Sequence, residues 1–232
     1  MESTDSRPLS TELLMKTTLL LTCVLLPFAA TAAEQTFDFK DPKGVNTARF
    51  TLDAPLETIS GNANGVSGTL TIDPAKPEAT KGSIVIDAKT LNVENAMMKE
   101  HMLGAEWLDV AKNPTITFTV MSLEDFKMSG QASPAPGAPK GSSMDSVTAT
   151  ANVKGKFSLK GVEKEIAVPA TVTLLKGKLG ARTGGKMQGD LMVIRTEFTI
   201  KRTDYGINPK ASVDKVSDDI VINLAIAGAS PK

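Results

Sequence analysis

Short runs of alternating apolar and polar residues dominate the chain. This pattern is typical of β-strands that bury one face and expose the other, because successive side chains of a strand point to opposite sides. At least eight such runs occur, and no long amphipathic helical pattern interrupts them. Their apolar members are Phe50 and Leu52; Leu70 and Ile72; Ile84 and Ile86; Ile116, Phe118 and Val120; Val153, Phe157 and Leu159; Ile166, Val168, Val172 and Leu174; Met192, Ile194, Phe198 and Ile200; and Ile220, Ile222, Leu224 and Ile226.

Residues that tolerate tight or positive-φ turns separate the runs. We expect turns at Gly61-Asn62, Asn64-Gly65, Asp73-Pro74, Lys160-Gly161 and Lys176-Gly177. Consecutive strands joined by turns favour an antiparallel all-β domain. A barrel and a sandwich both fit this pattern, and periodicity does not choose between them.

Two segments depart from the strand pattern. Residues 94–110 lose the period of two and place Met98 and Met102 at helical spacing, which predicts one or two short helices between strands. Residues 129–146 are rich in Pro, Gly and Ser and contain almost no bulky apolar residue. A segment of this composition buries too little surface to order itself, so we expect a flexible insertion there.

The N-terminal region resembles an export signal. A short apolar run follows Met15 and ends in small residues that include Ala32 and Ala33, which predicts a signal peptide cleaved after one of these two alanines. An uncleaved anchor is the alternative, but the run is shorter than the roughly 20 residues of a spanning helix. We therefore expect an upstream extension and signal peptide over 1–33 and one domain over 34–232, in the periplasm or secreted. Acidic residues upstream of Met15 leave open which methionine is the true start.

The single cysteine, Cys23, lies within that apolar run. A cleaved chain would have no thiol and no disulfide, so its stability would come from its core. Lipidation of Cys23 is a less favoured alternative, because Thr22 precedes it and apolar sequence continues beyond it.

Charge and histidine content argue against several functions. The 26 basic and 26 acidic residues cancel and are interspersed, which argues against a nucleic-acid partner. His101 is the only histidine, so the chain cannot build a His-rich metal site or a Ser/His/Asp triad. Glu100, Glu106 and Asp109 fit a solvated helical surface better than an acid and base pair. We expect no enzymatic activity, no cofactor and no metal.

Two charged residues follow the last apolar positions of one predicted strand. Arg202 and Asp204 have the parity of Phe198 and Ile200, so both side chains could face the interior. The favoured interpretation is an Arg-Asp pair that closes one end of a barrel. In the other, Arg202 faces an anionic or polar head group at the mouth of an apolar cavity.

Five short motifs occur in order along the chain. They are Val66-Ser67-Gly68-Thr69-Leu70-Thr71-Ile72-Asp73-Pro74; Lys99-Glu100-His101-Met102-Leu103 with Trp107-Leu108-Asp109-Val110; Asn113-Pro114-Thr115-Ile116-Thr117-Phe118; Lys156-Phe157-Ser158-Leu159-Lys160-Gly161-Val162; and Arg202-Thr203-Asp204-Tyr205-Gly206-Ile207. Together these motifs resemble the YceI-like family. This chain departs from the family pattern at Lys99-Glu100, at the insertion over 129–146, and between Arg49 and Gly61, where histidines of many members are missing. These departures affect the expected ligand more than the expected fold.

The resemblance implies a lipocalin-like antiparallel β-barrel of about eight strands, exported by a bacterium, that holds a polyisoprenoid or another long-chain lipid in its lumen. No membrane span is expected in the mature chain, and the oligomeric state, a homodimer included, is left open. The main alternative is an exported stress-response or protein-interaction module with a solidly packed barrel; an enzyme acting on isoprenoids is a third. Arg202 is the candidate head-group residue. The candidate lumen residues are Phe50, Leu70, Ile72, Ile84, Ile86, Met102, Trp107, Ile116, Phe118, Phe157, Leu159, Phe198 and Ile200.

Overall fold

The computed structural model describes residues 34–73, 75–131 and 146–232. The predicted signal peptide, its cleavage site and most of the predicted insertion lie outside these residues.

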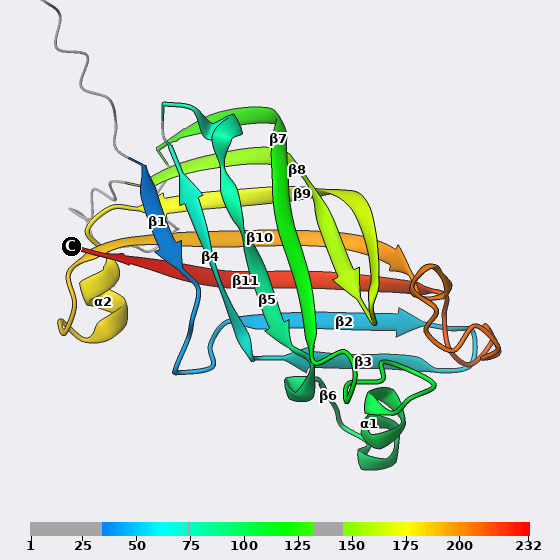
Figure 1. Cartoon of the computed structure of the whole chain (residues 1–232). Coiled ribbons are helices and arrows are strands. Elements are labelled where there is room, and N and C mark those ends of the chain that lie inside the picture. Colours follow the sequence, from blue (N-terminus) through cyan, green and yellow to red (C-terminus); the bar gives the residue numbers. More distant parts are fainter. Residues whose placement is uncertain (1–33, 74, 132–145) are drawn as a thin grey trace, which may run out of the picture. The chain divides into compact units, whose positions relative to one another are not determined.

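Eight antiparallel strands close into a barrel (Figure 1). Each strand pairs with the next around the ring, and the pair Asp38 and Ala229 joins the last strand to the first. The predicted antiparallel barrel is therefore confirmed, and the sandwich alternative is wrong. In ring order the strands are β1 (Gln35–Asp38), β4 (Val66–Ile72), β5 (Lys81–Asp87), β7 (Thr115–Gln131), β8 (Ser146–Leu159), β9 (Val162–Leu175), β10 (Gly189–Lys201) and β11 (Asp219–Pro231).

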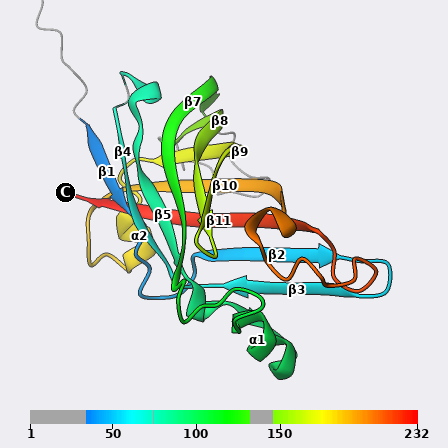
Figure 2. The ribbon, with the colours of Figure 1, turned by 45° about the vertical axis from the view of Figure 1, so that its right-hand side comes forward.

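Three further strands extend the sheet from β11 outside the ring. The first half of β11 pairs with β2 (Thr47–Asp53), which pairs with β3 (Thr58–Ala63), which pairs with β6 (Asn92–Val93). Both views show β2 and β3 beside β11 (Figure 1, Figure 2). The predicted turn at Gly61-Asn62 is wrong, because both residues lie within β3.

Short helices connect the strands. The helix expected within 94–110 is confirmed as α1 (Ala96–Leu103), which begins where the side chain of Asn95 accepts a hydrogen bond from the Met98 N–H at 3.0 Å. A second helix, α2 (Leu179–Thr183), lies outside the predicted segment. The described residues also form three turns of 3₁₀ helix: η1 (Pro77–Ala79), η2 (Ala88–Thr90) and η3 (Thr203–Tyr205).

Of two predicted connections between strands, one is confirmed and the other has the wrong bounds. Lys160 and Gly161, both at positive φ, form the expected tight turn between β8 and β9. The expected insertion over 129–146 is too long at both ends, because β7 continues through Gln131 and β8 begins at Ser146. The backbone pairing of these two strands orders residues that composition alone assigned to a loop.

Strands β9 and β10 separate along part of their length. Their last paired residues are Ala170 and Thr196, although β9 extends back to Val162 and β10 extends on to Lys201. Pro169 lies at the point of separation and has no backbone N–H to donate, so the ladder cannot continue through it. Beyond this point β9 stays with β8 and β10 stays with β11, and β7, β8 and β9 curve away from β10 (Figure 1, Figure 2).

Candidate functional site

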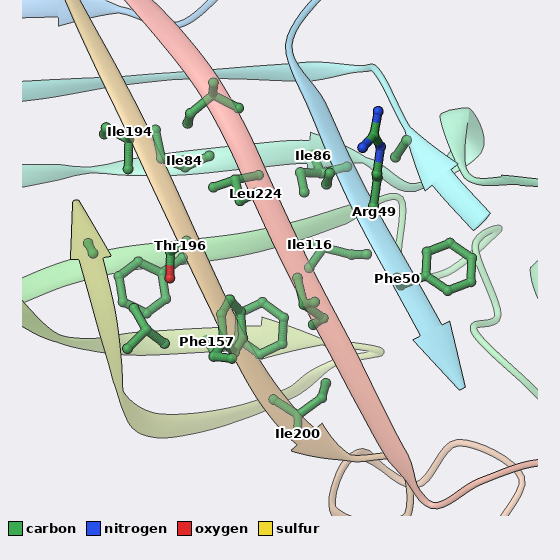
Figure 3. Close-up of a pocket in the computed structure, with 18 of the residues that line it drawn as sticks. Arg49, Phe50, Ile84, Ile86, Ile116, Phe157, Ile194, Thr196, Ile200 and Leu224 are labelled. Carbon is green, nitrogen blue, oxygen red and sulfur yellow. The ribbon is translucent and has the colours of Figure 1, made fainter. Parts of the chain in front are cut away.

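The interior of the barrel contains a cavity of about 530 Å³. Side chains from the ring strands other than β1, from β2, β3 and β6, and from α1 form its wall. In Figure 3 the apolar side chains of Ile84, Ile86, Ile116, Ile194 and Leu224 lie between the strands that surround this space. The cavity follows from the strand pattern, because residues of one parity on each strand face the same side.

All the candidate lumen residues lie in this wall, and so does Arg202. Six strands (β2, β4, β5, β7, β8 and β10), α1 and the segments that follow α1 and β10 bring them together from positions more than 150 residues apart. Their role in binding a ligand stays a prediction. The residues are Phe50, Leu70, Ile72, Ile84, Ile86, Met102, Trp107, Ile116, Phe118, Phe157, Leu159, Phe198 and Ile200.

Further wall residues were absent from the candidate set. Most share the parity of the apolar runs, so the same alternation could have found them: Val120, Val153, Val168, Val172, Leu174, Met192, Ile194, Ile220, Ile222, Leu224 and Ile226. Other wall residues gave no apolar strand signal. Among these, Thr196 is a polar residue at an inward position, and Lys215 and Val216 come from a loop.

Two aromatic rings of the wall lie over glycines of neighbouring strands. A Cβ at Gly61 would come within 2.3 Å of Phe50 Cζ, and one at Gly155 within 2.5 Å of Phe118 Cζ. A glycine in a strand leaves a gap that an aromatic ring from the next strand can cover. These glycines therefore allow the rings to lie against the wall.

Exposed apolar side chains form part of the wall at both ends of the cavity. One end is formed by α1 with Met98, by Glu57 of the β2–β3 turn, and by Lys215 and Val216. A hydrogen bond of 2.9 Å from the Leu56 N–H to the Asp214 carbonyl joins that turn to the loop. The other end consists of Ile72, Asp73, Pro77, Thr80, Phe126 and Met128, of which Met128 is 66% exposed.

Arg202 is buried in the wall, with 1% of its surface exposed. Its Nε–H donates to the Ser217 carbonyl at 3.3 Å, and Nη1 donates to the Ile207 carbonyl at 2.6 Å and to the Asn208 carbonyl. The predicted Arg202-Asp204 pair is wrong. Strand β10 ends at Lys201 and η3 begins, so the strand parity is lost and Asp204 faces outward.

The outward Asp204 pairs with Lys164 across the separation of β9 and β10, at 3.1 Å. The carboxylate whose pKa responds to the charge of the Arg202 guanidinium is Asp218. Burial raises the pKa of Asp218, but hydrogen bonds from the Thr203 N–H and hydroxyl, and the charges of Arg202 and Lys201, outweigh burial. The net effect holds the pKa of Asp218 below its usual value.

The other candidate polar residues lie away from the cavity or at its edge. His101 is exposed and borders the cavity beside Met102. Glu100 and Glu106 are exposed, and Asp109 forms an ion pair of 3.0 Å with Lys112. Within the described part of the chain, no three His, Cys, Asp or Glu side chains gather as a metal site would require. No helix in that part of the chain has the length and apolar character needed to span a membrane.

The fold is similar to several solved structures. BcnA of Burkholderia cenocepacia superimposes with a TM-score of 0.57 and 19% identity over 78% of this chain and 95% of that one. The YceI protein of Campylobacter jejuni gives a TM-score of 0.55 and 24% identity over 74% and 85%. A polyisoprenoid-binding domain from Saccharophagus degradans gives 0.54 and 13% identity over 86% and 100%.

Sequence comparison gives the same relationship. A UPF0312 protein of Pseudomonas paraeruginosa is 25% identical over 170 residues, which is 73% of each chain. Protein YceI of Salmonella arizonae is 26% identical over 174 residues, or 75% of each chain. The profile of the YceI-like domain matches residues 29–227. The chain therefore belongs to the YceI-like family.

Proposed function

We propose that this protein is an exported lipid-binding protein that holds a polyisoprenoid or a similar long-chain amphiphile in the barrel cavity. In this role it carries or stores the lipid and does not transform it. The observation that carries the proposal is the barrel cavity of about 530 Å³ with an almost wholly apolar wall.

The cavity suits a long apolar chain for a physical reason. Its volume falls within the roughly 300–1,000 Å³ of ordinary small-molecule sites. Each methylene-sized group that leaves water for an apolar wall contributes about 0.8 kcal/mol. Several isoprene units would therefore supply useful affinity with few polar contacts, and the shape of the cavity would select the ligand.

Two further observations support the proposal. The Saccharophagus degradans domain of the same fold is described as binding polyisoprenoids. The signal-like N-terminal sequence up to Ala33 supports export to the periplasm or beyond. A solidly packed barrel, as the interaction-module alternative requires, would leave no such cavity.

Filling the cavity tests the proposal. Ala149 is a small wall residue on β8, and Thr150 is the next residue, facing outward. Ala149→Phe places a ring in the empty space, whereas Thr150→Phe adds the same ring to the outer surface. Both variants should stay folded, because the cavity has room for the added atoms.

Native mass spectrometry after gentle purification from the bacterial envelope provides the measurement. Wild type and Thr150→Phe should carry co-purified lipid, and both should bind geranylgeraniol added to delipidated protein. Ala149→Phe should lose most of this binding. Wild-type protein that carries no lipid and binds neither geranylgeraniol nor palmitate would refute the proposal.

A further inference from the structure

Arg202 is the only charged side chain, among the residues that the structure describes, that is both buried and part of the cavity wall. The other charged wall residues reach solvent: Arg49, Glu57, Asp73 and Lys215. Burying a charge costs much free energy unless partners compensate it. The role of Arg202 can therefore be inferred from the hydrogen-bond and charge partners of its guanidinium.

The hydrogen bonds of Arg202 use only part of its capacity. A guanidinium has five N–H donors. Nε–H is taken by Ser217, and the two N–H groups of Nη1 are taken by Ile207 and Asn208. Nη2 is buried and has no hydrogen-bond partner among the described residues. Holding the loop together explains three donors and leaves two without an acceptor.

The charge of Arg202 is also only partly compensated. Its three acceptors are neutral backbone carbonyls, and no carboxylate in the described chain lies within 4.0 Å of it. Asp218 feels its charge, but the oxygens of that carboxylate already accept from the N–H and hydroxyl of Thr203. This end of the cavity therefore has a guanidinium with free donors and with no carboxylate of the described chain in ion-pair contact.

Trp107 fixes the position of the guanidinium. The Arg202 Cζ lies 5.9 Å from the centroid of the Trp107 ring, a cation–π arrangement. Trp107 is part of the same wall and is the only tryptophan of the chain. The ring and the three carbonyls hold the guanidinium in one orientation, which is what selective recognition of a head group requires.

We propose that Nη2 of Arg202 binds the head group of the ligand, and that this head group carries an anionic oxygen, as a phosphate or carboxylate does. The head group lies at the end of the cavity near Trp107 and Lys215, and the apolar chain extends toward Phe126 and Met128. This inference rests on the proposed function, because it names the class of lipid that the cavity takes and the direction in which the lipid lies.

The direction can be tested in the wild-type protein by quenching of Trp107 fluorescence. Bromine quenches indole only near contact, so α-bromopalmitate and ω-bromopalmitate report which end of the chain lies beside Trp107. The α-bromo probe should quench strongly and the ω-bromo probe weakly, at equal saturation. Equal quenching, or stronger quenching by the ω-bromo probe, would overturn the proposed direction.

The charge preference is tested with probes that differ only in the head group. Geranylgeranyl monophosphate and palmitate should bind wild type about tenfold or more tightly than geranylgeraniol and cetyl alcohol. A preference in the prenyl pair alone indicates a phosphate ligand, and one in the palmitate pair alone indicates a carboxylate. Alcohols that bind as tightly as both anions refute this inference and leave the proposed function intact, whereas no binding of any probe refutes both.

Variants assign the preference to Arg202. Arg202→Gln should reduce the anion-to-alcohol affinity ratio to near one, and Arg202→Lys should retain part of it. Arg195→Gln makes the same change on the outer face of β10 and should leave the ratio unchanged. An unchanged ratio in folded Arg202→Gln would contradict the assignment. If Arg202→Gln fails to fold, the quenching experiment and the anion-to-alcohol comparison in the wild-type protein still test the proposed direction and charge preference of the ligand.

Discussion

The Thr196 hydroxyl donates a hydrogen bond of 2.6 Å to the Pro169 carbonyl at the point where β9 and β10 separate. Beyond this bond, β9 and β10 have no backbone pairing, and only side chains join them along the line of separation, which we call the seam. The Phe157 ring contacts the rings of Phe198 and Tyr205 edge to face, with centroids 5.9 and 5.6 Å apart. Thr196 is therefore the last residue of β10 that pairs with β9 through the backbone. Its side chain also forms part of the cavity wall (Figure 3).

Replacing Thr196 by valine should loosen the seam. The change keeps the shape and removes the donor, so the Pro169 carbonyl loses its partner and the free energy of unfolding should fall by about 1 kcal/mol. Backbone amides of residues 197–201 and 163–168 should exchange hydrogen faster than in wild type. Thr199→Val, at an exposed position of the same strand, is the control. Identical exchange in both variants would show that the aromatic rings alone hold the seam.

A methyl group at Gly61 should disturb the wall at Phe50. The added Cβ would lie 2.3 Å from Phe50 Cζ and 2.4 Å from the Asn92 carbonyl oxygen, and neither distance is sterically possible. Gly61→Ala should therefore lower the free energy of unfolding by about 1–3 kcal/mol in urea denaturation. Asn62→Ala, at the next and exposed position of β3, should change it by less than about 0.5 kcal/mol. Equal stability of the two variants would contradict the close ring contact.

The sequence predicts the strands of this barrel well because their alternation is regular. It fails where a tertiary contact overrides the local pattern. Gly61-Asn62 looks like a turn, but pairing with Phe50 and Arg49 of β2 places both residues inside a strand. The alternation also cannot show that β9 and β10 separate, because the inward parity of β10 continues unchanged from Ile194, before that point, to Phe198 and Ile200 beyond it.

Arg202 shows the same limit at the candidate site. Its parity correctly indicates an inward side chain, since the last strand residues before it keep the alternation. The η3 turn then rotates the chain, so Asp204 leaves the interior and meets Lys164. The actual partners of Arg202 are the carbonyls of Ile207, Asn208 and Ser217, and no sequence pattern identifies backbone acceptors in a loop.

Export predicts a defined mature N-terminus. The apolar run after Met15 and the small residues before Glu34 fit a cleavable signal, so N-terminal sequencing of protein from the periplasm should begin at Ala33 or Glu34. Replacing Ala30 and Ala32 by bulky residues should block processing and leave a larger species on the membrane. Mature periplasmic protein that still contains Cys23 would contradict cleavage at this site.

The Asp41 carboxylate organises the turn that leads into β2. It accepts hydrogen bonds from the N–H groups of Lys43, Val45 and Asn46 and lies 3.2 Å from the Arg182 guanidinium, which ties the turn to α2. Burial raises the pKa of Asp41, but these N–H groups and the Arg182 charge outweigh burial and hold the pKa below the ordinary 3.8. The ionised form therefore stabilises the folded state.

The sign of the pH dependence follows from that shift. A carboxylate whose pKa is lowered on folding contributes its full stability above the pKa of the unfolded chain and loses it as the pH falls through the lower folded value. Asp41→Asn should therefore cost about 1–3 kcal/mol in urea unfolding near neutral pH, and the difference from wild type should shrink steadily as the pH drops below 3.8. Glu78→Gln, an exposed carboxylate with no hydrogen bond in the described chain, should match wild type near neutral pH. A gap between wild type and Asp41→Asn that stays constant into strong acid would mean that the amide loses packing or hydrogen-bond geometry and not charge.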